Sequence, residues 1–294
     1  MQSQPSSDNS PIAVREARPE DAPICGRICY DAFTKISTEH GFPPDFPSAE
    51  VATNVLSMMF SHPGFYCVVA ESDGKILGSS CLDERSVIAG VGPITIDPEI
   101  QNKGVGRALM EALLNRSTER GFPGARLLQA AFHNRSLSLY TKLGFDTREP
   151  ISTMQGPPIK AATPGYGIRP ARMSDLEECN RLCRRVHGHD RGGELRDAIE
   201  QGTAQVAMRE GRIAAYSAGI GFFGHTVGEG NADVQALIAN ADAFAGPGIL
   251  VPTRNAALFR WCLENGLRVV QPMTLMTMGL YNEPAGAYLP SILY

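Results

Sequence analysis

The alternation of apolar and polar positions predicts a mixed succession of strands and helices along the first half of the chain. Short apolar runs bounded by turn residues indicate strands, and apolar residues that recur every three or four positions indicate helices. Strands are expected at residues 12–17, 65–70, 75–83, 86–96 and 126–132, and helices at 19–37, 49–61, 104–120 and in a short segment ending near 143. With a final strand, the order is β-α-α-β-β-β-α-β-α-β.

A glycine-bearing turn between a strand and a helix is the strongest candidate for a binding element. The turn reads Gln101-Asn102-Lys103-Gly104-Val105-Gly106-Arg107-Ala108-Leu109. The first N–H groups of a helix lack internal partners and carry the positive end of its dipole, so they can bind an anion. Glycines at 104 and 106 remove Cβ atoms that would keep a pyrophosphate away. The turn therefore predicts a phosphate site.

Three phosphate-binding patterns compete for this turn. The chain has no G-x-x-x-x-G-K-[ST] string, which excludes a Walker loop, and Leu109 stands where a Rossmann turn needs its third glycine. The remaining pattern, Q/R-x-x-G-x-G/A, resembles the pyrophosphate turn of the GNAT superfamily of acyl-CoA-dependent N-acyltransferases. The run Ser136-Leu137-Ser138-Leu139-Tyr140-Thr141-Lys142-Leu143-Gly144-Phe145 matches that family's [A/S]-x-x-L-Y-x-K-L-G-F ending at every specified position.

The resemblance implies an α/β fold, a mixed sheet flanked by helices, with acetyl-CoA or another short acyl-CoA as cosubstrate and no metal. It implies that Tyr140 is the general acid, since a phenol with an ordinary pKa near 10 keeps its proton until it meets a thiolate. The residues implied to bind the cofactor are Ile94, Thr95, Ile96, Gln101, Asn102, Lys103, Gly104, Val105, Gly106, Arg107, Ala108 and Asn134.

Two parts of this implied site carry their own alternatives. The strand residues 94–96 would pair with pantetheine and offer an N–H to the carbonyl oxyanion, while their side chains belong to the core. Asn134 stands one position later than the family's asparagine, because His133 occupies that place. An asparagine before a helix is also an ordinary N-cap. Lys103 and Arg107 could flank phosphates or be solvated cations.

A general base is less clearly marked than the acid. Asp83 and Glu84 end the second strand of the predicted hairpin and are the carboxylates expected to line the acceptor cleft, with a solvated turn as the alternative. His133 is a second candidate for the base. Some GNAT enzymes use a chain of waters instead. The predicted catalytic set is therefore Tyr140, Asp83 and Glu84.

The second half of the chain repeats the first. Residues 14–29 and 168–183 align without gaps, with seven identities among sixteen positions, and residues 255–267 echo 134–145 with one extra residue. Such agreement indicates two copies of one fold in tandem. The layout is similar to bacterial GNAT proteins that carry a C-terminal GNAT-like domain.

The second copy lacks the chemistry of the first. Residues 224–231 do not contain the phosphate pattern, and they place Glu229 near the position a pyrophosphate would need. Where the first copy has Tyr140, the second offers Trp261 or Cys262, depending on where the gap falls. Neither is a good proton donor to a thiolate. We expect this degenerate half to cap or complete the amine site of the first.

These patterns predict four segments. They are a disordered lead-in at 1–10, a catalytic GNAT domain at 11–150, a linker at 151–164 and a degenerate GNAT-like domain at 165–294. The linker is indicated by its Gly and Pro content.

Composition narrows the class of protein. Of 294 residues, 43% are hydrophobic and 20% charged, as in soluble globular proteins, and a net charge of −4 gives no general attraction to nucleic acid or anionic lipid. No apolar run could span a membrane and the N-terminus is polar, so a cytoplasmic location is expected. The seven cysteines, at 25, 29, 67, 81, 179, 183 and 262, are expected to be reduced thiols, mostly buried.

Three further patterns resemble binding motifs for a dinucleotide or a metal ion. Residues 219–224 fit G-x-G-x-x-G without an immediate helix, which disfavours a dinucleotide site. The pairs Cys25/Cys29 and Cys179/Cys183 are spaced as two metal ligands on a helix could be, but small buried side chains are the favoured interpretation. His187-Gly188-His189 has no ligand partners identifiable from sequence.

The predicted function is acetyl-CoA-dependent N-acetyltransfer to a small-molecule amine, directly within a ternary complex. The alternative is a non-catalytic acyl-CoA-binding or sensing protein, and a third reading is a structural partner that binds no cofactor. No nucleic-acid or membrane partner is expected, and a homodimer is allowed.

Overall fold

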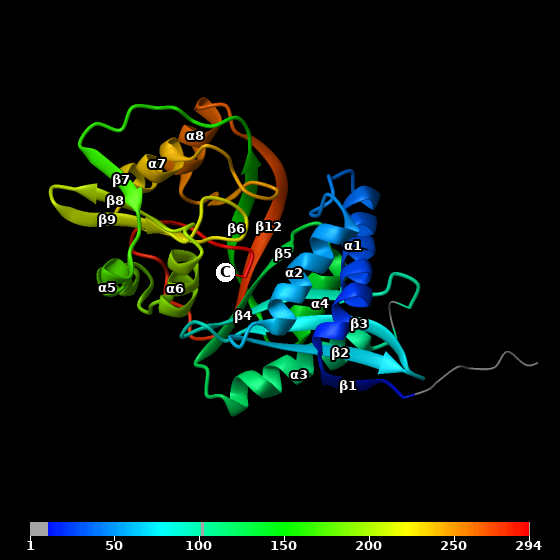
Figure 1. Ribbon diagram of the computed structural model, residues 1–294. Helices are drawn as coiled ribbons and strands as arrows, with labels where there is room; N and C mark the ends of the chain where they lie inside the picture. The colour runs from blue at the N-terminus through cyan, green and yellow to red at the C-terminus, as the bar shows by residue number, and fades with distance from the viewer. Residues whose placement is uncertain (1–10, 101–102, 294) are drawn as a thin grey trace, which may run out of the picture.

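The computed structural model describes residues 11–100 and 103–293 and has two α/β halves joined by a pair of long strands (Figure 1). Within these ranges, no helix is long and apolar enough to cross a membrane. The predicted lead-in at 1–10 and the turn residues Gln101 and Asn102 lie outside the described residues.

The first half has the order of elements that the apolar pattern predicts, with ends that agree to within a few residues. Its strands are Ala13–Glu16 (β1), Phe65–Ser72 (β2), Lys75–Asp83 (β3), Ala89–Ile96 (β4), Gly124–Ala130 (β5) and Asp146–Gln155 (β6). Its helices are the 3₁₀ turn Pro19–Asp21 (η1) and the α-helices Ala22–Glu39 (α1), Ala49–Ser61 (α2), Val105–Glu119 (α3) and Asn134–Lys142 (α4).

The second half runs through the same types of element. Its strands are Tyr166–Pro170 (β7), Gln205–Arg209 (β8), Arg212–Ser217 (β9), Thr226–Gly228 (β10), Ile249–Pro252 (β11), Arg268–Gly279 (β12) and Ala287–Leu289 (β13). Its helices are Met173–Asp175 (η2), Leu176–His187 (α5), Gly192–Glu200 (α6), Asn231–Asn240 (α7) and Ala256–Glu264 (α8).

The same Arg–Asp pair between the first strand and the first helical turn occurs in both halves, which agrees with the internal repeat. Arg15 donates two hydrogen bonds to the Asp21 carboxylate at 2.7 and 3.0 Å, and Arg169 donates two to Asp175 at 2.7 and 2.9 Å. Each aspartate also accepts a backbone N–H three residues earlier, at 2.8 Å. The same bidentate pair therefore fixes the first strand against the first helix in both copies.

The two halves exchange their sixth strands. One sheet has the order β1-β2-β3-β4-β5-β12-β6-β11, and the other has the order β13-β10-β9-β8-β7. Strand β12 of the second half pairs with β5, and β6 of the first half pairs with β11. These two long strands also pair antiparallel with each other, and they form the centre of the molecule in Figure 1. Each half is therefore completed by a strand from the other.

Because of this strand exchange, the linker begins later than the sequence predicts. Residues 151–155, placed in a linker by their sequence, are the end of β6, where Ile151 pairs with both Met273 and Pro252. The chain between β6 and β7 is irregular, as expected. The sequence predicts a final strand here but not its extension to residue 155, because the partners of that extension lie about a hundred residues further along the chain.

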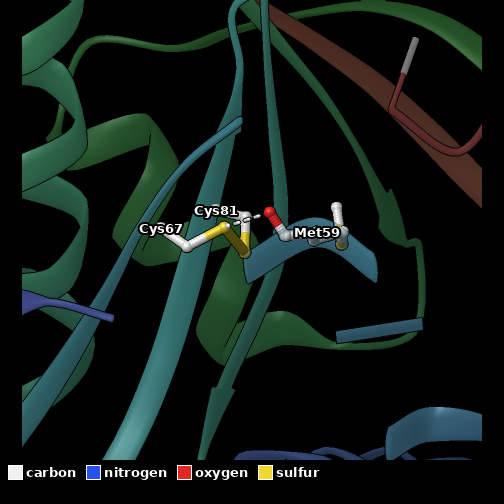
Figure 2. The surroundings of a disulfide bond; sticks show 3 residues. All are labelled: Met59, Cys67 and Cys81. Atoms are coloured by element: carbon white, nitrogen blue, oxygen red, sulfur yellow. Dashed lines mark hydrogen bonds between the residues drawn. A yellow bond between two sulfur atoms is a disulfide. The ribbon is translucent and has the colours of Figure 1, made fainter. Parts of the chain in front are cut away.

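The cysteines depart from the expectation of seven reduced thiols. Cys67 and Cys81 are joined by a disulfide between β2 and β3, with Cα atoms 4.1 Å apart and the Met59 carbonyl oxygen 3.8 Å from Cys67 Sγ (Figure 2). The hairpin was predicted, but a register shift after Ala70 brings Cys81, rather than Ser80, opposite Cys67. The other five cysteines are free and buried, as expected.

Strands β4 and β5 part soon after they meet. Within the described part of the chain, they pair only at Ala89 with Ala125 and at Gly90 with Arg126, and the rest of β4 has no strand partner on that side. On its other side β4 follows β3, with an irregularity where Gly92 and Pro93 face the single residue Cys81. Such a bulge bends a strand. A wedge-shaped opening between β4 and β5 results.

Candidate active site

A cavity of about 930 Å³ fills this opening and extends between the two halves. The first half contributes α1, α2, β4, β5, α4 and the start of α3. The second half contributes α6, the loop 218–224 and the segment 292–293. The predicted phosphate turn, the β4 edge and Tyr140 therefore border a single space, one wall of which comes from the second half.

The start of α3 has the geometry of an anion site. Gly104 is its N-cap residue, and the first intrahelical bond runs from Ala108 N to Gly104 O, at 3.1 Å. The N–H groups of Val105, Gly106 and Arg107 precede that bond and point out of the helix end. The first turn contains no acidic residue that could occupy them.

The two glycines of the turn have different physical roles. Gly104 has φ +88°, which favours glycine, and no atom of the described residues lies within 4 Å of where its Cβ would be. The space beside it is therefore open to a ligand. At Gly106 a Cβ would lie 2.9 Å from Ile96 Cδ1, so this glycine allows the helix to pack closely on β4.

The cations near the turn are exposed. Lys103 and Arg107 both lie on the surface, and Arg107 Nη1 is 3.2 Å from Glu111 of the next helical turn. Arg107 borders the cavity, whereas Lys103 and Ala108 are not among its lining residues. An exposed i,i+4 ion pair contributes little, so Arg107 is free to turn toward a phosphate.

The β4 residues predicted to bind pantetheine lie along the open edge. Ile94, Thr95 and Ile96 all line the cavity, and on their other side they pair with residues 78–80 of β3. Their outer backbone edge faces the opening left by β5. An extended ligand can therefore add to β4 as a further strand.

Tyr140 lies on α4 against the core of the first half and borders the cavity. Its side chain is almost fully buried, and burial raises the pKa of its phenol well above 10. Among the residues that the structure describes, its hydroxyl has no hydrogen-bond partner. The phenol therefore keeps its proton at neutral pH and can donate it into the cavity.

His133 and Asn134 occupy positions different from those expected. The N-cap of α4 is His133, whose Nδ1 accepts the N–H of Ser136 at 3.2 Å, and Asn134 is the first helical residue. Burial lowers the pKa of His133. Because the cap uses the unprotonated Nδ1, it also opposes proton uptake by His133. Asn134 is exposed and does not line the cavity.

The predicted base carboxylates are occupied by arginines away from the cavity lining. Asp83 accepts from Arg85 at 2.8 and 2.6 Å, and Glu84 accepts from Arg116 at 2.7 and 3.1 Å. Neither carboxylate lines the cavity, although the Arg85 side chain does. The structure thus separates Asp83 and Glu84 from the space that contains Tyr140.

Three other carboxylates border the cavity and gave no sequence signal. Burial opposes ionisation of Glu194, yet Arg191, His225 and Arg85 hold its pKa at about 2. Asp197 lies 2.8 Å from Arg85 Nη1, a contact across 112 positions of chain. Asp45 lies in the loop between α1 and α2. Only the tertiary fold brings these groups together.

A buried amide is another group without a local sequence signal. Gln129 of β5 is 5% exposed, and its Oε1 lies 3.0 Å from the Ser136 hydroxyl. Its Nε2 has no hydrogen-bond partner among the described residues. The single Ser136 proton can also go to the His133 carbonyl, at 2.9 Å, so the amide could equally be reversed. In either orientation one buried polar atom is left for a ligand.

The helix caps settle which residue of the second copy replaces Tyr140. Asn255 caps α8 by accepting the Leu258 N–H, just as His133 caps α4. Seven residues after each cap stand Tyr140 and Cys262, so the two segments align without the expected extra residue. Cys262 is fully buried, and burial raises the pKa of its thiol to about 12.

In the second copy, the turn that corresponds to the phosphate turn is shorter, and carboxylates occupy it. Strand β10 ends at Gly228 and α7 begins at Asn231, so the long turn of the first half is missing. The Asp233 carboxylate accepts the Gly230 N–H at 2.8 Å. Glu229 beside it is paired with three arginines, at positions 185, 209 and 212. A pyrophosphate would meet two carboxylates here.

The structure also shows where the G-x-G-x-x-G stretch at residues 219–224 and the His187-Gly188-His189 pattern lie. Loop 219–224 joins β9 to β10 with no helix after it, and it lines the cavity. His187 and His189 are buried at the end of α5. Within residues 11–100 and 103–293 there is no group of three His, Cys, Asp or Glu placed to hold a metal ion.

We compared the chain with protein-family models, with curated proteins and with solved structures. Residues 30–145 match the acetyltransferase (GNAT) family model. Mycothiol acetyltransferase from Cellulomonas flavigena is 30% identical over 139 residues, which are 44% of this chain and 39% of that relative. This chain thus spans about two fifths of the curated relative's length.

Two solved structures have the same overall fold. One, from Pyrococcus horikoshii and provisionally named an acetyltransferase, superposes with a TM-score of 0.73 at 17% identity and covers 94% of both chains. A tandem GNAT protein from the clavulanic acid biosynthesis pathway gives a TM-score of 0.54 at 12% identity, covering 92% of this chain and 98% of its own. Residues 30–145, in the first half of the chain, are therefore similar to the acetyltransferase (GNAT) family, and the whole chain shares its fold with these two solved structures.

Proposed function

We propose that the protein is an acetyl-CoA-dependent N-acetyltransferase that acts on a small-molecule amine. The observation that carries this proposal is the single cavity that joins the α3 N-terminus, the open edge of β4, Tyr140 and a chamber walled by the second half. A mycothiol acetyltransferase among the relatives supports acetyl transfer to a small molecule.

The residues around the cavity suit the successive parts of an acyl-CoA. The free N–H groups at residues 105–107 and the open space beside Gly104 would hold the pyrophosphate. The β4 edge at 94–96 would pair with pantetheine and present a backbone N–H to the thioester carbonyl oxygen. Tyr140 would protonate the departing thiolate, whose conjugate thiol has a pKa near 8.5.

Direct transfer in a ternary complex is favoured over an acyl-enzyme intermediate. None of the described cysteines lines the cavity, and burial raises the pKa of every free thiol, to about 11 for Cys25 and Cys183. A thiol that stays protonated is a poor nucleophile. The amine itself is therefore expected to attack the thioester in its neutral form, with the proton that it loses passing to solvent water while Tyr140 protonates the departing thiolate.

Thiol release from acetyl-CoA, followed across a panel of amines, tests the proposal. Saturable release that depends on both acetyl-CoA and an amine is expected, with the N-acetylated amine identified by mass. Saturable CoA binding without turnover on any amine would instead support the acyl-CoA sensor. Absence of any thermal shift with CoA would contradict both and support a structural partner protein.

A further inference from the structure

Asp45 is held in place by a stiff loop on the rim of the cavity. The loop reads Phe42-Pro43-Pro44-Asp45-Phe46-Pro47, and three prolines restrict its backbone. Aromatic contacts fix it on both sides of Asp45. The Phe42 ring stacks on Phe132 at 4.3 Å, and the Phe46 ring lies 5.9 Å from Phe33. The carboxylate is therefore presented in one position before any ligand arrives.

Among the described residues, one oxygen of the Asp45 carboxylate has a hydrogen-bond donor and the other has none. One oxygen, Oδ1, accepts from Gln271 Nε2 of β12 at 2.8 Å. Among residues 11–100 and 103–293, no Lys, Arg or His is ion-paired with Asp45. Burial raises the pKa of Asp45, which reflects the cost of leaving a charge in this site without a counter-charge.

The other two carboxylates in the cavity lining each have an arginine partner. Glu194 is paired with Arg191, and Asp197 with Arg85 at 2.8 Å. Their charges are already compensated by the protein, so neither needs a cationic ligand. Of the carboxylates in the described cavity lining, Asp45 is the one that a ligand cation would complete.

Apolar side chains form part of the wall of the same cavity. Helices α1 and α2 contribute Phe33, Val55 and Met59, and the second half contributes Phe222 and Ile292. Asp45 lines the large cavity and, together with Gln271, a smaller pocket of about 290 Å³, so its carboxylate lies between the two. A ligand that fills this chamber would bury an apolar body and place one polar end at Asp45.

We propose that Asp45, oriented by Gln271, binds the ammonium group of the acceptor, and that the acceptor is a primary amine on a bulky apolar group. This inference rests on the proposed acetyl transfer and names the substrate class of the same cavity. Because Gln271 belongs to the second half, that half takes part in acceptor recognition through its hydrogen bond to Asp45.

Binding of 2-phenylethylamine to the full chain saturated with CoA tests the inference without turnover. Calorimetry is expected to show binding at least roughly tenfold tighter than that of 2-phenylethanol, which lacks the charge, and of ethanolamine, which lacks the apolar body. Equal affinity for the amine and the alcohol, or tighter binding of ethanolamine, would overturn it. This comparison needs only the unaltered protein.

Two matched variants locate the effect. Asp45→Asn should weaken 2-phenylethylamine binding roughly tenfold or more while leaving 2-phenylethanol unchanged. Asp73→Asn, in the exposed β2–β3 turn outside the cavity, should change neither. Unchanged amine binding by Asp45→Asn would remove Asp45 from the site. If amine binding follows these expectations but no amine is acetylated, the proposed reaction fails and the ammonium site stands.

Discussion

Single residues act in the proposed site through properties that their surroundings impose. In the proposed reaction Tyr140 can supply a proton because its phenol is protonated at neutral pH, and Gly104 is needed for its left-handed backbone. A local sequence motif marks both residues. Asp45 and Glu194 carry no such motif, since their roles depend on partners far along the chain.

Replacing Tyr140 with phenylalanine removes the proton donor while keeping the packing. We expect kcat for amine acetylation to fall about 100-fold, as for loss of a general acid, with the KM for acetyl-CoA changed by less than roughly twofold. Tyr30→Phe, on α1 outside the cavity lining, is the matched control. Unchanged turnover at every pH would exclude Tyr140 from the reaction.

Replacing Gly104 with alanine strains the turn at φ +88° and should move the N–H groups that hold the pyrophosphate. The KM for acetyl-CoA is expected to rise roughly tenfold. Gly121→Ala is matched in strain, because Gly121 has φ +73° at the other end of α3 with open space around it. If both variants raise the KM equally, the effect comes from stability and the phosphate role of the turn is contradicted.

At the scale of elements, the exchange of β6 and β12 is the feature that the sequence did not predict. The apolar pattern was enough to find the strands and helices of the first half because each is a local signal. Strand partners are not local: β12 enters between β5 and β6 from the far end of the chain. The same limit applies to Cys67 and Cys81, whose pairing depends on a register shift.

The exchanged strand predicts that the first half does not fold by itself. A fragment ending at residue 155 lacks β12, so β5 and β6 lose the strand that lies between them. We expect this fragment to show no cooperative urea transition, and to recover one when the separately produced remainder is added. Cooperative unfolding of the isolated fragment, at the urea midpoint of the full chain, would contradict the exchange.

At the scale of the whole molecule, buried histidines should make the protein sensitive to acid. Burial lowers the pKa of His189 from 6.5 to about 4, and it also lowers those of His187 and His225. The unfolded chain therefore binds more protons than the folded one in this range. Stability from these groups is complete above pH 6.5 and is lost as the pH falls toward 4.

Urea unfolding at a series of pH values measures this dependence. The free energy of unfolding is expected to fall steadily between pH 6.5 and 4, and His189→Gln should make that fall shallower. His40→Gln, at the exposed end of α1, should leave the slope unchanged. A slope that His189→Gln does not alter would show that this histidine is not held neutral in the folded protein.

At the scale of the whole molecule, the second half forms one wall of the cavity. It therefore has a role in the proposed site, although its own phosphate turn is closed and Cys262 stands where the first half has Tyr140. Steady-state thiol release from acetyl-CoA with 2-phenylethylamine tests it most directly. We expect saturable release with formation of the N-acetylated amine, and a raised KM for the amine, but not for acetyl-CoA, in Asp45→Asn. No release with this amine or any other in the panel, despite saturable CoA binding, would contradict it.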